Sequence, residues 1–81
     1  MARVTILPPL DAEFFGGASS FEVDAGNVFE LVGMLGQRSP GFAEVADVRA
    51  AIAVDDLLTA DWATPLSGTS NVLLVPRVGG G

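Results

Sequence analysis

The sequence contains no cysteine, histidine, lysine or tyrosine. Without cysteine there is no disulfide framework, no thiol nucleophile and no thiolate metal site, which fits a protein of the cytoplasm. Most acid–base and nucleophilic catalysis depends on the four missing residue types. We therefore do not expect an enzyme or a metal site, but a chain that acts together with partner enzymes.

Long apolar runs and positive charge are also scarce. No run approaches the roughly 20 apolar residues that cross a bilayer, and the N-terminus has no signal-peptide pattern. We therefore expect a cytoplasmic chain with no membrane partner. Four basic residues face ten acidic ones, for a net charge of -6. This balance argues against nucleic acid, and it either favours a basic docking partner or only prevents aggregation.

The chain does have enough apolar residues, 49 % of its 81, for one small globular domain. Its most informative stretch is the end. Residues 72–75 form a continuous apolar run, which is typical of a strand buried on both faces, and Pro76 stops that strand. Three glycines then present no side chain. We expect a domain over residues 1–78, a flexible tail over residues 79–81, and a reactive group at the carboxylate of Gly81.

Two alternating segments open the chain. Residues 3–7 and 19–24 each place apolar side chains on one face, which predicts an antiparallel pair of strands. The segment between them, residues 10–18, has mixed character and is expected to be a loop. Phe14 and Phe15 are expected to anchor this loop onto the core, although they could instead form a contact patch.

The main helix is predicted after Asn27, which reads as an N-cap with Glu30 completing a capping-box pair. One apolar stripe follows at Val28, Leu31, Val32 and Leu35. Gly33 weakens the helix and suggests a close approach of another segment, and Gly36 is the expected C-terminal cap.

The second half of the chain is less regular. Residues 43–48 are ambiguous, with a short turn of helix as one interpretation, and residues 49–54 predict a third strand. The acidic pair at 55–56 reads as a turn rather than as a cation site, and residues 57–66 as a short strand or irregular edge. If the final strand lies between the first and third strands and parallel to the first, the result is a two-layer α+β domain.

At this point the chain resembles the ubiquitin-like sulfur carriers of the MoaD/ThiS type, including the small subunit of molybdopterin synthase. The resemblance spans nearly the whole length. It is carried by Gly26-Asn27-Val28, Pro40-Gly41-Phe42, Pro65-Leu66 and the ending Val75-Pro76-Arg77-Val78-Gly79-Gly80-Gly81. It implies a β-grasp fold, with a mixed sheet of four to five strands and one main helix across it.

The resemblance also implies a mechanism. An E1-like enzyme would adenylate Gly81 with ATP, sulfur would convert it to a thiocarboxylate, and a synthase or large subunit would accept the sulfur. The chain itself would bind no cofactor, because ATP is used by the activating partner. The expected partner-binding residues are Val75, Pro76, Arg77, Val78, Gly79 and Gly80.

Several alternatives stay open. The same tail would suit a protein modifier that is joined to target lysines, and the fold would suit a plain interaction module. Among the carrier pathways, the long first loop favours molybdopterin synthesis over thiamine synthesis, and Gly16-Gly17 is similar to the carriers of cysteine synthesis. The absence of lysine either prevents acylation of neighbouring copies or reflects codon usage.

Overall fold

The computed structural model describes residues 1–77 of the chain. The predicted boundary between domain and tail, and with it Val78, Gly79, Gly80 and Gly81, lies outside the described residues. The elements, in chain order, are β1 (Ala2–Ile6), α1 (Leu10–Phe14), β2 (Ser20–Val23), α2 (Val28–Arg38), α3 (Phe42–Arg49), β3 (Ala50–Val54), β4 (Leu57–Thr59) and β5 (Asn71–Pro76).

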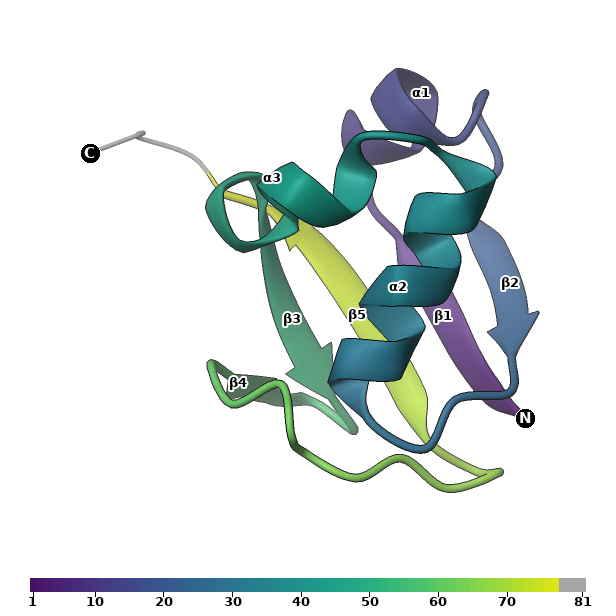
Figure 1. The fold of residues 1–81 in the computed structure, drawn as a ribbon, viewed down its shortest axis with the longest axis vertical. Coiled ribbons are helices and arrows are strands. Elements are labelled where there is room, and N and C mark those ends of the chain that lie inside the picture. Colours follow the sequence, from purple (N-terminus) through teal and green to yellow (C-terminus); the bar gives the residue numbers. More distant parts are fainter. Residues whose placement is uncertain (78–81) are drawn as a thin grey trace.

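The strands form one mixed sheet in the order β2-β1-β5-β3-β4 (Figure 1). The last strand, β5, lies in the middle, parallel to β1 and antiparallel to β3. Both the predicted position of the final strand and its predicted direction are therefore confirmed. β2 pairs antiparallel with β1, as the two alternating segments predicted.

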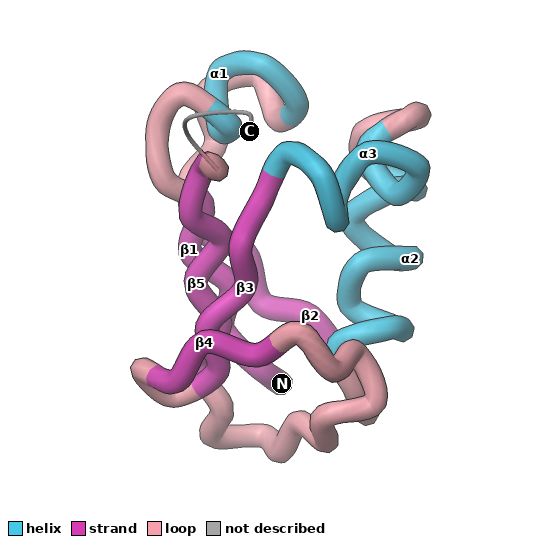
Figure 2. The backbone as a smooth tube through the Cα atoms, turned by 90° about the vertical axis from the view of Figure 1, so that its left-hand side faces the viewer, coloured by secondary structure: helices cyan, strands magenta, loops and turns pink. Residues whose placement is uncertain are grey.

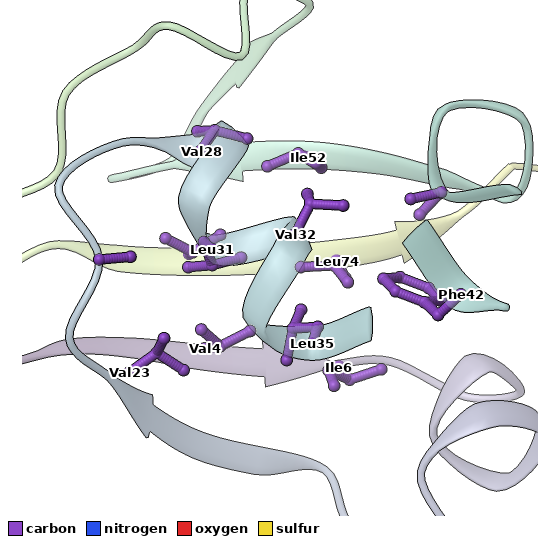
Figure 3. Close-up of a cluster of buried hydrophobic side chains, with 14 of the residues drawn as sticks. Val4, Ile6, Val23, Val28, Leu31, Val32, Leu35, Phe42, Ile52 and Leu74 are labelled. Atoms are coloured by element: carbon purple, nitrogen blue, oxygen red, sulfur yellow. The ribbon is translucent and has the colours of Figure 1, made fainter. Parts of the chain in front are cut away.

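The helices α2 and α3 cover one face of the sheet (Figure 2). Between them and the strands lies a core that draws on every layer (Figure 3). Its largest fully buried side chains are Phe42, Ile6, Leu10, Leu31, Leu35, Leu74, Val4, Val28 and Val72. Within the described residues no helix is long and apolar enough to cross a membrane.

The N-cap of α2 is the predicted one, but the C-terminal end of the helix and the glycine at its close contact with α3 differ from the prediction. Asn27 accepts a hydrogen bond from the Glu30 backbone N–H at 2.8 Å, and the Glu30 carboxylate accepts one from Gly26 at 2.9 Å. The helix passes the expected cap at Gly36 and reaches Arg38. A Cβ on Gly36 would lie 2.9 Å from that of Ala43, whereas one on Gly33 would meet nothing within 4 Å. The close approach to α3 is therefore at Gly36, and the expectation for Gly33 was wrong.

The expected loop over residues 10–18 instead begins with the short helix α1, because Leu10 is buried in the core and the aromatic pair is anchored. The rings of Phe14 and Phe15 each lie 5.2 Å from the ring of Phe42, which confirms the predicted anchoring. The ambiguous segment 43–48 is part of α3, which starts at the fully buried Phe42.

The third strand begins at Ala50, one residue later than predicted, because α3 continues through Arg49. The predicted turn at Asp55 and Asp56 is confirmed, and both residues have positive φ angles, of 49° and 72°. Aspartate tolerates this backbone region better than most residues, which suits a tight two-residue hairpin. β4 follows and is only 3 residues long, so most of residues 57–66 form the irregular edge that we predicted.

Candidate partner-docking surface

The predicted partner-binding residues that the structure describes lie at the end of the central strand. Val75 is half-buried and pairs with Ala51 of β3, and Pro76, also half-buried, pairs with Ala50. Arg77 follows directly and is exposed. A strand held on both sides by neighbouring strands is a rigid base, so the chain leaves the sheet from a fixed point.

The face of the sheet opposite the helices carries an apolar surface. Along β5, Val72 and Leu74 point into the core, while Leu73 and Val75 alternate onto the other face and are half-buried. The register sets Leu73 beside Ala53, and Ala53 beside Leu58, which is 74 % exposed. We call Leu58, Leu73 and Val75, with the small residues between them, the outer apolar face.

This arrangement corrects the expectation that the final strand is buried on both faces. The strand is central, but within residues 1–77 no helix packs over the outer apolar face (Figure 2). The run of apolar residues therefore covers two different environments. Val72 and Leu74 are 1 % and 0 % exposed, whereas Leu73 and Val75 remain accessible to a partner.

Polar contacts secure the point where the chain leaves the sheet. The Arg77 backbone N–H donates to the Arg49 carbonyl at 3.0 Å, and its side-chain Nε donates to the Ala50 carbonyl at 3.1 Å. The guanidinium of Arg49 forms an ion pair with Glu13 of α1, with an N–O distance of 2.6 Å. It also lies 5.4 Å from the ring centre of Phe14. These contacts join α1, α3 and β3 to the last described residue.

Sequence reasoning missed part of this site. Leu58 and Leu73 were not among the predicted residues, although strict alternation along residues 71–76 would have placed Leu73 opposite Leu74. The ion pair between Glu13 and Arg49 joins residues 36 positions apart, and no local pattern signals such a contact. Among the described residues no group of three or more acidic side chains could hold a metal ion.

The site therefore has the geometry of a docking platform. It combines an apolar sheet face, a rigid central strand and an Arg77 that hydrogen bonds hold at one rim. The ionisable side chains near the end of β5 are arginines and a paired glutamate. Such groups can bind and orient a partner through charge and hydrogen bonds.

Comparison with known proteins agrees with this description, although no family model and no curated protein matches the sequence. A solved complex of subunits 1 and 2 of molybdopterin-converting factor from Helicobacter pylori 26695 contains a chain 30% identical to this one. The match covers 99% of this chain and 97% of that chain, with a TM-score of 0.71.

Two further structures share the fold at lower identity. One is the Amycolatopsis orientalis BexX/CysO complex, with 18% identity over 100% of both chains and a TM-score of 0.81. The other is CysO, an antigen, from Mycobacterium tuberculosis, with 19% identity over 96% of this chain and 100% of that chain, and a TM-score of 0.81. Two of the three structures are thus complexes with a second protein.

The five-stranded mixed sheet, the parallel β1–β5 pair and the main helix across one face define a ubiquitin-like β-grasp protein. The sequence identity of 30% over nearly the full length of both chains then shows the family of this protein. The chain belongs to the MoaD/ThiS family of sulfur carriers.

Proposed function

We propose that the chain is a sulfur carrier whose terminal residue, Gly81, is the chemical handle. The observation that carries this proposal is the membership of the family, together with a run of three glycines that is separated from the rigid central strand by two residues in the sequence. The chain supplies recognition and delivery, and its partners supply catalysis.

The proposed reaction begins at the carboxylate of Gly81, which is a poor electrophile. An E1-like enzyme uses ATP to convert it to an acyl adenylate, and pyrophosphate is released. A sulfide donor then attacks the acyl carbon and expels AMP, which leaves a thiocarboxylate. A synthase or large subunit accepts the tail and transfers the sulfur to its substrate. ATP is bound by the activating partner, and the carrier needs no cofactor of its own.

We further propose that the activating enzyme docks on the outer apolar face and on the segment from Val75 to Gly80. The uncovered Leu58 and Leu73 supply apolar contact area on one side of the sheet. The net charge of -6 would attract a basic docking surface on the partner. Molybdopterin synthesis is the favoured pathway, because a chain of the molybdopterin-converting factor complex is 30% identical. Synthesis of cysteine or thiamine comes next.

Mass spectrometry of the intact protein purified from its native host tests the proposal. A thiocarboxylate replaces one oxygen by sulfur and raises the mass by about 16 Da. A Val-Gly-Gly-Gly remnant on lysines of other proteins, which trypsin leaves when it cleaves after Arg77, would indicate a protein modifier instead. If neither species forms, and the protein retains its function without Gly80 and Gly81, the chain is an interaction module and the proposal fails.

A further inference from the structure

We propose that Arg77 is a positioning residue, which fixes the start of the tail from within the chain. This inference deepens the proposed function and rests on it for one of its two readouts. The two edges of β5 stop pairing at different residues, one before Pro76 and the other after it. The register explains why.

On the β3 side, hydrogen-bonded pairs alternate along the strands. Asp55 donates to Asn71 and Arg77 donates to Arg49, so these two pairs belong to the same bonded series, and Pro76 lies in a non-bonded pair with Ala50. The missing N–H of the proline therefore faces β1 and not β3. The last backbone bond on that side joins Leu7 to Leu74, before Pro76, so the proline interrupts no bond there.

The consequence is an asymmetric exit. On the β1 side the last backbone bond is donated by Leu7 to the Leu74 carbonyl, at 3.0 Å. On the β3 side pairing continues to Arg77, whose side-chain Nε adds a second bond, to the Ala50 carbonyl. Two donors of one residue thus bind two successive carbonyls at the junction of α3 and β3. A single bond would leave the backbone free to rotate about it, whereas two bonds fix its direction.

The receiving side of this contact is itself held in place. Arg49 carries the first acceptor and is joined to Glu13 by two hydrogen bonds, of 2.7 and 2.6 Å. Ala50 is 2 % exposed, and its N–H caps α3 by donating to Ala46. The chain after Arg77 therefore starts from a defined place relative to the outer apolar face. Tail positioning of this kind reduces the ordering cost when a partner binds.

Two substitutions separate this role from a direct charge contact with a partner. Glutamine carries its amide nitrogen at the same number of bonds from Cα as the Nε of arginine, so Arg77→Gln keeps the donor without the charge. Arg77→Lys keeps the charge but has a methylene at that place. The same two substitutions at Arg3, at the opposite end of the sheet, serve as controls.

The first readout needs no partner. Amide hydrogen exchange of residue 77 is measured by NMR and compared with the rate of that residue in an unfolded chain. Loss of one hydrogen bond of ordinary strength accelerates exchange about fivefold. We expect this acceleration in Arg77→Lys and near wild-type protection in Arg77→Gln. The Leu7 amide, which donates to Leu74 on the other side of β5, should not change in either variant.

The second readout is ATP–pyrophosphate exchange with the cognate activating enzyme. We expect KM for the carrier to rise about fivefold in Arg77→Lys while kcat changes less than about twofold, and to rise less in Arg77→Gln than in Arg77→Lys. Equal exchange of residue 77 in all variants would overturn the positioning role. ATP–pyrophosphate exchange that is retained in Arg77→Lys but lost in Arg77→Gln would also overturn the positioning role, because this result indicates a charge contact with the partner. If amide hydrogen exchange follows the expectation but the activating enzyme never adenylates the wild-type protein, the proposed function fails. The contact of Arg77 with Ala50 would then still stand.

Discussion

Truncation of Leu74 tests which face of the central strand is buried. Its side chain is 0 % exposed and lies beneath α2, near Val32 and Phe42 (Figure 3). The strands on both sides hold Ile6 and Ile52 at the same level, so the cavity left by Leu74→Ala cannot easily collapse. We therefore expect Leu74→Ala to lower the free energy of unfolding by about 3–4 kcal/mol, within the usual range for such sites. The total free energy of unfolding of such a domain is only about 5–15 kcal/mol.

The matched control is Leu73→Ala, the same change one residue earlier on the outer apolar face. Because Leu73 is only half-buried and no helix within the described residues covers it, its truncation should lower the free energy of unfolding by about 1 kcal/mol or less. Trp62 is the single tryptophan and packs half-buried against the core, so its fluorescence can follow unfolding in urea. With a slope of about 1 kcal/mol/M, Leu74→Ala should lower the midpoint by about 3 M.

Equal losses in the two alanine variants, or a larger loss for Leu73, would refute the assignment of faces. If Leu74→Ala is unfolded without urea, Leu74→Val removes less volume and should still cost about 1 kcal/mol. The comparison with Leu73→Val then replaces the alanine pair. The order of the two losses is the prediction, and it does not depend on the absolute stability of the domain.

Three further predictions concern the main helix and the tail. Asn27→Ala removes the acceptor for the Glu30 N–H, and thermal unfolding should show a loss of about 1 kcal/mol, or about 4–8 °C in Tm; an unchanged Tm would contradict the cap. Gly33→Ala should stabilise the protein by up to about 1 kcal/mol, whereas Gly36→Ala should destabilise it by about 1–2 kcal/mol because its Cβ meets that of Ala43. Equal changes in the free energy of unfolding, measured in urea, would exclude the close packing of α2 on α3. One residue appended after Gly81 should abolish ATP–pyrophosphate exchange without changing the unfolding midpoint, and undiminished exchange would exclude the terminal carboxylate as the handle.

The short helix α1 shows why part of the fold escaped prediction. Five residues cannot form a stable helix alone, so nothing in residues 10–14 distinguishes this helix from a loop. It forms because distant groups hold it. Phe14 packs edge-on against Phe42 of α3, and Glu13 pairs with Arg49. The position of Gly36 against Ala43 likewise depends on a helix that sequence patterns left ambiguous.

The candidate site divides in the same way. The end of the central strand near Pro76 and the candidate residues Val75 and Arg77 could be named from the sequence, because proline cannot donate to a ladder and is therefore rare inside a central strand. The outer apolar face could not, since Leu58 and Leu73 belong to different strands and become neighbours only through Ala53. Registers between strands are set by long-range pairing, which local patterns do not contain.

The sequence by itself determined the order of the main elements along the chain and the cap of α2. Each of these depends on periodicity or on chemistry within about four residues along the chain. Only the tertiary structure decided which side of β5 is left uncovered and how Arg77 is held, because exposure depends on what packs against a residue. A continuous apolar run is typical of a strand in the interior of a fold, but the number of layers above and below that strand is a property of the whole fold.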